Sequence, residues 1–136
     1  MLVVDSSAVI AMLFEEPRGG ACAAALGSAA RRLISAVNYV EAGTVLAGRA
    51  RQNERDKALA DLVAFLTTFR IEIAPVTEDL AREALKARIK YGKGFGSKKG
   101  LNFGDSFAYA LARSHGAPLL FVGDDFSRTD IENALA

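Results

Sequence analysis

Five carboxylates in this sequence stand where an apolar run predicted to be a strand ends, or where a predicted helix begins. Asp5 directly follows the apolar run at positions 1–4, and the others are Glu41, Asp105, Asp124 and Asp125. The run at 1–4 does not alternate with polar residues, which predicts a central strand buried on both faces of a parallel sheet. In a parallel sheet, ligand crevices lie outside the carboxyl ends of the strands, so these positions meet at one edge. Each acid by itself is explained as well by helix capping or by a turn. Together they predict a crevice lined with carboxylates.

Clustered carboxylates have a defined chemistry. Their mutual repulsion, made stronger by burial, either raises their pKa values or recruits a cation. Mg²⁺ uses a few carboxylates together with waters and substrate phosphates, and Mn²⁺ fits a similar oxygen site. The sequence therefore predicts a Mg²⁺ or Mn²⁺ site at this edge.

Other kinds of site are excluded by what the sequence lacks. Cys22 is the one cysteine and His115 the one histidine, so a zinc cluster lacks its ligands. His115 is expected at the surface, near the end of a helix, so no interior histidine is left for a Ser-His-Asp triad. The glycine-rich stretch 92–100 has no Walker A spacing, and it follows a predicted helix rather than a strand. Metal-assisted hydrolysis of a phosphate ester remains.

The elements that must position these acids alternate along the chain. Apolar runs predict strands over 1–4, 33–36, 71–76 and 118–122, and helical patterns cover 8–16, 20–32, 37–51, 54–69, 78–91 and 103–115. Strands separated by helices pair in parallel through crossovers. We expect a single α/β domain over residues 1–136, a three-layer sandwich whose central, mainly parallel sheet has four to five strands flanked by helices.

The apolar spacing also predicts which helix faces point inward. In the helix over 78–91, the residues expected inside are Leu80, Ala84, Leu85 and Ile89. In the helix over 37–51, one face carries Val40, Thr44, Val45 and Ala47, and in the helix over 54–69 the spacing i, i+3, i+4, i+7 is shown by Leu59, Leu62, Val63, Leu66 and Phe69. Near the end of the chain, Ser127 and Asp130 have the spacing of a capping box, which predicts a short last helix.

Positive charge is concentrated before Asp105. Residues 82–99 contain seven basic residues and one acid, a local balance of +6, whereas the net charge of the whole chain is +1. Lys93, Lys98 and Lys99 are therefore candidates for a rim that holds a nucleic-acid backbone. The alternative is a solvated helix face followed by a mobile loop.

Composition points to a globular protein of a reducing compartment. Hydrophobic residues make up 51% of the chain, and the mean hydropathy is +0.17. The single cysteine favours the cytoplasm. The first apolar run lacks a basic region and is interrupted by Asp5, so it does not resemble a signal peptide. No stretch approaches the ~18 apolar residues of a membrane span.

Several motifs together resemble the PIN-domain family, and within it the VapC-type toxins of bacterial toxin–antitoxin pairs. The resemblance covers essentially the whole chain. It rests on Glu41 after the second strand and on the segments VDSSA (4–8), YGKG (91–94), LNFGDSFAYALA (101–112), PLLFVGDDF (118–126) and TDI (129–131).

This resemblance implies a metal-dependent endoribonuclease that uses Mg²⁺ or Mn²⁺. Asp5 and Asp105 match the principal metal-binding acids, and Glu41 matches the third acidic position. Asp125, next to Phe126, is favoured as the fourth, although strand geometry equally allows Asp124. Ser7 matches a small hydroxyl beside the metal. Apart from the resemblance, the spacing of Asn102 and Asp105 fits a helix cap, in which Asn102 would support Asp105.

The implied mechanism is in-line attack of a metal-activated water on the phosphodiester, with a 3′-hydroxyl as leaving group. The resemblance also implies a VapB-type antitoxin that inserts a segment into the active-site groove, and a homodimer. The RNA target stays open; single-stranded loops and tRNA are candidates.

Three alternatives stay open. A haloacid-dehalogenase-like phosphatase also begins with a strand that ends in Asp, but it needs a second Asp where this chain has Ser7. A receiver-like regulatory domain needs a lysine after the last strand, where Val122 and Gly123 stand. A PIN-like module could also bind RNA or a partner without cleavage.

Overall fold

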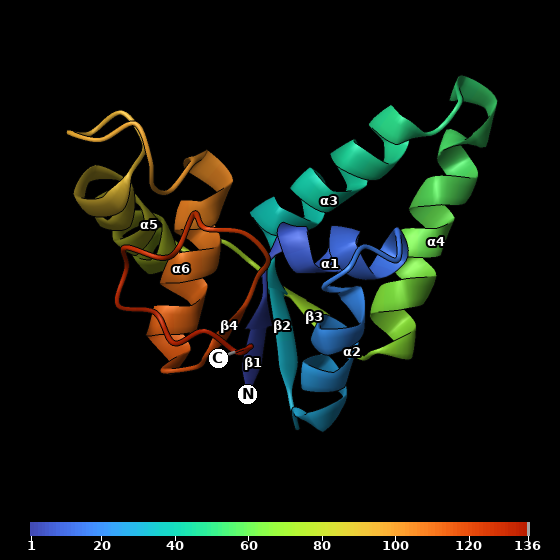
Figure 1. Cartoon of the computed structure of the whole chain (residues 1–136), viewed down its shortest axis with the longest axis horizontal. Helices are drawn as coiled ribbons and strands as arrows, with labels where there is room; N and C mark the ends of the chain where they lie inside the picture. Colours follow the sequence, from blue (N-terminus) through green and yellow to red (C-terminus); the bar gives the residue numbers. More distant parts are fainter. Residues whose placement is uncertain (136) are drawn as a thin grey trace.

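A four-stranded parallel sheet forms the centre of the protein (Figure 1). The computed structural model describes residues 1–135. The strands are β1 (Leu2–Val4), β2 (Arg32–Ser35), β3 (Ile71–Ala74) and β4 (Leu119–Leu120), in the spatial order β3-β2-β1-β4. β1 pairs with β2 on one side and with β4 on the other. The strand that carries Asp5 therefore lies inside the sheet, as the sequence predicts.

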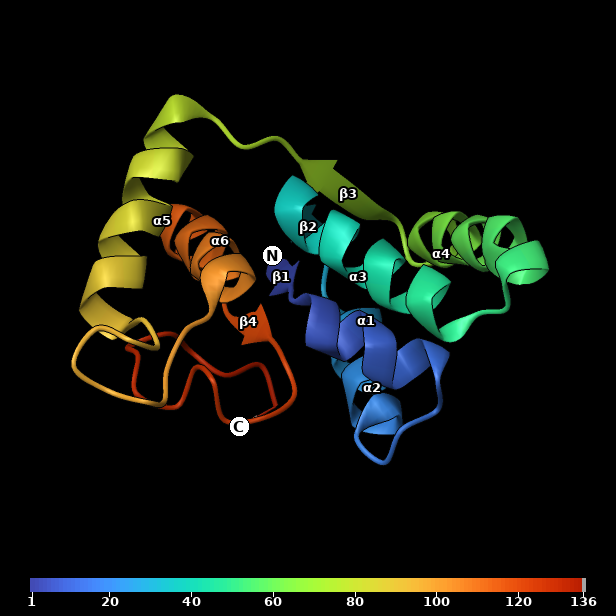
Figure 2. The ribbon, with the colours of Figure 1, turned by 90° about the horizontal axis from the view of Figure 1, so that it is seen from above.

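Helices cover both faces of this sheet, which confirms the predicted three-layer α/β fold. One layer contains α1 (Ser6–Leu13), α2 (Gly19–Ser28), α3 (Ala36–Arg49), the short 3₁₀ turn η1 (Gln52–Glu54) and α4 (Arg55–Thr68). The other contains α5 (Glu78–Tyr91) and α6 (Phe103–His115). Figures 1 and 2 show the two layers on opposite sides of the strands.

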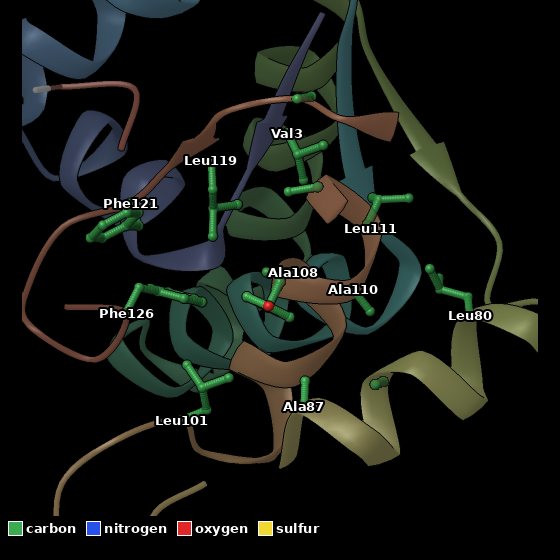
Figure 3. Close-up of a cluster of buried hydrophobic side chains, with 14 of the residues drawn as sticks. Val3, Leu80, Ala87, Leu101, Ala108, Ala110, Leu111, Leu119, Phe121 and Phe126 are labelled. Carbon is green, nitrogen blue, oxygen red and sulfur yellow. The ribbon is translucent and has the colours of Figure 1, made fainter. Parts of the chain in front are cut away.

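The two faces of β1 explain why its sequence does not alternate. Val3 packs into a core with α5 and α6, whereas Leu2 and Val4 pack into a second core with the other helices. Figure 3 shows the first core, in which Val3 and Leu119 of the sheet lie beside Leu111 of α6. A strand that is buried on both faces needs apolar side chains at every position.

The last strand is shorter than the predicted 118–122. β4 contains only Leu119 and Leu120. The backbone N–H of Val122 donates to the Ser7 hydroxyl (3.0 Å) rather than to a neighbouring strand. A contact with the first helix thus ends the strand and ties it to the edge where Asp5 lies.

The apolar helix faces that the sequence indicates are only partly the buried ones, and the inward face predicted for α5 is partly wrong. In α3, Val40 and Val45 are exposed, and the buried residues are Asn38, Ala42, Gly43 and Leu46. In α4, Leu62 and Leu66 are buried but Leu59 and Val63 are exposed. In α5, Leu85 and Ile89 are exposed, and Ala87 is buried beside Leu80 and Ala84. Small residues form much of the real inner stripe in α3 and α5, because close helix packing leaves little room for side-chain volume there.

The capping box predicted at Ser127 is also wrong, since no helix follows it in the described residues up to 135. The Ser127 hydroxyl donates to the carbonyl of Asp124 (2.7 Å), and Asp130 accepts a hydrogen bond from the hydroxyl of Tyr109 in α6. Side-chain hydrogen bonds to a local turn and to α6 therefore hold this segment, and it forms no helix.

Arg32 at the start of β2 supplies a test of the fold. Its guanidinium donates to the carbonyls of Leu26 (2.6 Å), Phe69 (2.5 Å) and Gly27 (3.3 Å), at the carboxyl ends of α2 and α4. We expect Arg32→Ala to lower the free energy of unfolding by about 2–3 kcal/mol, because these carbonyls lose a charged donor. Urea denaturation measures the change.

Arg31→Ala is the matched control for this measurement. Arg31 pairs only with the exposed Glu72 (3.0 Å), and surface pairs of this kind contribute about 0–1 kcal/mol. Equal losses of stability in the two variants would contradict the role assigned to Arg32.

Candidate active site

Asp5 is both a helix cap and a carboxylate with a free oxygen. It is the N-cap of α1, and its Oδ2 accepts hydrogen bonds from the Ser7 N–H (3.0 Å) and the Ser7 hydroxyl (2.6 Å). Its Oδ1 is buried and has no hydrogen-bond partner among the described residues. Capping therefore uses one oxygen of Asp5 and leaves the other available to a ligand.

Burial raises the pKa of Asp5 from 3.8 to about 6. The hydrogen bonds from Ser7 oppose this rise, and the negative charge of Glu41 adds to it. Burial thus makes the charged form of Asp5 unfavourable, and a nearby cation would stabilise that form.

Asp105 lies in the first turn of α6 and is fixed by a reciprocal pair of hydrogen bonds. Its N–H donates to Oδ1 of Asn102 (2.8 Å), and its Oδ2 accepts the N–H of Asn102 (3.0 Å). The predicted Asn102–Asp105 cap is therefore confirmed as a capping box. The Asp105 side chain is buried. Its role in the cap therefore does not exclude its role as a candidate ligand.

The surroundings of Asp105 disfavour its charge. Burial is the main cause that raises the pKa of Asp105 well above its usual value. The N–H of Asn102 opposes the rise, while the charge of Asp5 and the carboxyl group of Asp125 add to it. Asp5 and Asp125 are thus both close enough to act on Asp105. Together with Glu41 we refer to them as the acid cluster.

Glu41 reaches the acid cluster from α3. Its Oε1 accepts hydrogen bonds from the Asn38 side chain (2.8 Å) and the Ser6 hydroxyl (3.3 Å). The same Asn38 amide group donates to the carbonyl of Gly104 in α6 (3.0 Å). Asn38 therefore joins the beginnings of α3 and α6 and orients Glu41 between them.

Gly104 allows Glu41 to approach α6. A Cβ atom at this position would lie 2.0 Å from Oε2 of Glu41, so any other residue would displace the carboxylate. Sequence reasoning did not single out Asn38, Gly104 or Ser6. Two signals were present: an amide on the apolar side of a helix, and a glycine beside a candidate ligand.

Asp124 and Asp125 differ in their environment. Asp125 acts on Asp105, whereas the charge of Asp124 is not among the influences on either buried aspartate. Both line a pocket of about 420 Å³ together with Lys93, Lys98, Lys99, Gly100, Ser127 and Arg128, which we term the basic pocket. This geometry favours Asp125 over Asp124 as the fourth acid.

The basic residues divide into two groups. Arg82 pairs with Glu78 and Asp79, and Lys86 pairs with Glu83, all within α5. Lys93, Lys98 and Lys99 form no ion pair with any residue between 1 and 135, and they line the basic pocket.

The loop that carries these lysines is tied to the C-terminal segment. The Arg128 guanidinium donates to the hydroxyl of Ser97 (2.7 Å). In Figure 2 the loop after α5 and the C-terminal segment lie on the same side of α6. The positive rim and Asp125 thus belong to one surface.

The donor set suits a hard divalent cation. Asp5 and Asp105 are both buried, and the charge of Asp5 raises the pKa of Asp105. One oxygen of Asp5 has no partner among the described residues, so the pair matches the few protein ligands that Mg²⁺ and Mn²⁺ use beside waters. Within residues 1–135, no group of three or more His, Cys, Asp or Glu side chains is close enough to hold a metal by itself. Any cation would thus keep part of its shell for water and substrate.

The fold is that of a PIN-domain protein. The PIN-domain family model matches residues 2–132, and the chain belongs to this family. Ribonuclease VapC28 of Mycobacterium tuberculosis is 41% identical over 135 residues, which cover 98% of each chain. Ribonuclease VapC30 of the same species is 40% identical over 130 residues, covering 96% of this chain and 95% of the relative. Within the family, the chain belongs with the VapC ribonucleases.

Solved structures agree on the fold. VapC20 of M. tuberculosis, a toxin that cleaves the sarcin–ricin loop, superimposes with a TM-score of 0.75 at 19% identity and covers 96% of both chains. The DNA-bound VapBC structure from Salmonella typhimurium gives 0.73 at 18% identity, covering 97% of this chain and 94% of that one. In the part of the chain that is described, no helix is long and apolar enough to cross a membrane.

Proposed function

We propose that this protein is the toxin of a toxin–antitoxin pair and hydrolyses RNA phosphodiester bonds with Mg²⁺ or Mn²⁺. The observation that carries the proposal is the buried pair Asp5 and Asp105, held by helix caps at the edge of the sheet, with one oxygen of Asp5 left unpartnered. The kinship with VapC ribonucleases favours this function over a phosphatase and over a module that only binds.

In this proposal Asp5 and Asp105 hold the cation. When bound, it supplies positive charge for the phosphate oxygens and lowers the pKa of water. Ser7 fixes the orientation of Asp5, and Asn102 fixes that of Asp105. The helix caps hold both carboxylates in position before RNA binds. These side chains therefore lose little conformational freedom when the substrate arrives.

Glu41 and Asp125, the outer acids of the cluster, accept the proton that the attacking water loses. Glu41 and Asp125 flank the buried pair and act as base toward the attacking water. Asn38 and Ser6 orient Glu41 for this task. Asp124 stays a weaker candidate for the same role as Asp125. The bond to the 3′-oxygen breaks, which leaves a 3′-hydroxyl on one product and a 5′-phosphate on the other.

Metal removal and product analysis test this proposal. Purified protein should cleave labelled RNA with Mg²⁺ or Mn²⁺, lose that activity in EDTA, and regain it when the metal is restored. The new ends should be 5′-phosphate and 3′-hydroxyl, read by phosphatase and ligase treatment of the fragments. Cleavage that persists in EDTA and leaves 2′,3′-cyclic phosphates would contradict the proposal, because the 2′-hydroxyl would then be the nucleophile.

Lys93, Lys98 and Lys99 are proposed to contact the RNA backbone. We expect the double variant Lys98→Ala/Lys99→Ala to bind single-stranded RNA more weakly. The slope of log K against log salt should fall by about 1.4, since each phosphate contact on a single strand contributes about 0.7. A filter-binding titration at several salt concentrations measures both quantities.

Lys57→Ala/Lys86→Ala is the control, since it removes the same charge from lysines that pair within their own helices. An unchanged affinity and salt slope in the Lys98/Lys99 variant would exclude these residues from the rim.

The partners follow from the same family. VapBC complexes are among the structural neighbours, which supports a VapB-type antitoxin as partner. A homodimer is proposed as well, and the exposed Leu85 and Ile89 on α5 offer it an apolar surface. Light scattering of the purified protein tests the dimer. A cytoplasmic location is proposed on the single, buried Cys22.

A further inference from the structure

A second pocket adjoins the acid cluster at Glu41, and none of the lysines lines it. It measures about 650 Å³ and is lined by Ala36, Val37, Val40, Glu41, Thr44, Val45 and Phe103. Its walls carry no basic side chain, and Glu41 is its one charged residue. We term it the apolar pocket. It is large enough for a small planar ligand but is unsuited to a phosphate.

Phe103 is the most distinctive wall of the apolar pocket. Its side chain is 67% exposed, although it lies only two residues before the buried Asp105. The ring packs against Phe107 (centroids 5.1 Å apart), and this contact holds it at the mouth of the pocket. Exposing an aromatic ring to water is unfavourable. A ligand that covers the ring would remove this cost.

The backbone around Phe103 is unusually well fixed. The carbonyl of Phe103 accepts the Ser106 hydroxyl (2.6 Å), and that of Gly104 accepts the Asn38 amide group (3.0 Å). On the other side, the Asn102–Asp105 capping box holds the start of α6. The ring is therefore presented by a rigid segment and does not sit on a loose loop.

The acid cluster adjoins both pockets. Glu41 lines the apolar pocket and acts on Asp5, and Asp125 lines the basic pocket and acts on Asp105. A nucleotide strand whose phosphate reaches Asp5 and Asp105 would thus have positive charge on one side and an apolar, aromatic wall on the other. Unstacked bases stack on exposed aromatic rings, whereas phosphates do not.

From this arrangement we propose that Phe103 and the apolar pocket receive an unstacked base of the RNA substrate, next to the bond that is cut. The inference rests on the proposed function, since it assumes RNA at the acid cluster. Phe103 would then help to decide which RNA is cleaved: a base held in a duplex cannot reach it, so the pocket selects single-stranded substrate.

The absence of tryptophan from the chain makes a direct test possible. In an Asp5→Asn background, which is expected not to cleave, Phe103→Trp supplies a single fluorophore in the pocket. Oligo(A) or oligo(U) should quench its emission, and inorganic polyphosphate, which has charge but no bases, should not. The control is Phe14→Trp in the same background, because Phe14 is exposed on Arg49 at the far end of α1 and should respond to neither.

A second variant measures the energetic effect. In the same background, Phe103→Leu should weaken the binding of oligo(A) about 10-fold or more, the change expected for the loss of one stacked base at ~1–3 kcal/mol. Phe103→Tyr should bind like the parent. Circular dichroism should be unchanged in both, since the side chain is exposed.

Two results would overturn the inference: no quenching of the Phe103→Trp variant by either oligonucleotide, or unchanged affinity in Phe103→Leu. If wild-type protein still cleaves RNA in that case, the proposed function survives and the pocket belongs to another ligand, such as an apolar side chain of a protein partner. If the Phe103→Trp variant is quenched but wild-type protein cleaves no RNA with either metal, the base site stands and the nuclease proposal fails.

Discussion

Asp5→Asn is expected to reduce RNA cleavage by at least about 10³-fold. The variant keeps the cap of α1, because an amide oxygen can still accept the two hydrogen bonds from Ser7. It loses the charge and the free carboxylate oxygen that a cation needs. A loss of about 4 kcal/mol of transition-state stabilisation corresponds to this factor, and metal ions supply several kcal/mol in such sites. Single-turnover cleavage of labelled RNA measures it.

The same variant should also change how stability depends on pH. The pKa of Asp5 is about 6 in the folded protein and 3.8 as its reference value, so the folded state keeps the proton more tightly. Between these values the unfolded chain has already lost its proton, and the free energy of unfolding therefore falls as pH rises. For Asp5 the fall amounts to about 3 kcal/mol, at about 1.4 kcal/mol for each pH unit.

Asp5→Asn should remove this part of the slope between pH 4 and 6, which urea denaturation at a series of pH values can measure. Mg²⁺ should raise the melting temperature of the wild type, more at pH 8 than at pH 5, and should not raise that of the variant.

Asp56→Asn provides the control, since Asp56 is an exposed acid in the first turn of α4. It should leave cleavage and the metal response as they are. Full nuclease activity and an unchanged metal response in Asp5→Asn would refute the assignment of the metal to Asp5.

Gly104→Ala should lower cleavage by about 10²-fold while the protein stays folded. The new Cβ would lie 2.0 Å from Oε2 of Glu41, so the carboxylate must leave its position against α6. Removing a positioned base typically costs 10²- to 10⁴-fold in rate. Because the displaced atom is the end of a flexible side chain, the fold itself should tolerate the change.

A double-mutant cycle separates this effect from general damage. Glu41→Ala removes the carboxylate that Gly104→Ala displaces, so adding Gly104→Ala to it should cause little further loss of cleavage. Gly48→Ala is the matched control in α3, because a Cβ there meets nothing within 4 Å. It should stabilise the helix by roughly 0.5–1 kcal/mol and leave cleavage unchanged. Additive losses in the double variant would show that Gly104 does not act through Glu41.

The sequence by itself determined the parts of this protein that depend on short-range patterns. The uninterrupted apolar run before Asp5 predicted an interior strand of a parallel sheet, and the spacing of Asn102 and Asp105 predicted their cap. Both features depend on residues within one turn or one strand, where side-chain type alone decides the backbone geometry. The convergence of Asp5, Glu41 and Asp105 followed from one topological rule: parallel strands end at the same edge.

Only the tertiary structure decided how the elements meet. Leu85 and Ile89 fit the inward pattern of α5 but are exposed, because α6 packs against the narrower stripe that contains Ala84 and Ala87. The bridge from Asn38 to Gly104 spans 66 positions, and the preference for Asp125 over Asp124 depends on its contact with Asp105. Such contacts depend on where distant backbones lie, and no local pattern encodes that. The sequence therefore predicted that these acids lie at one edge of the sheet, and packing decided what orients them.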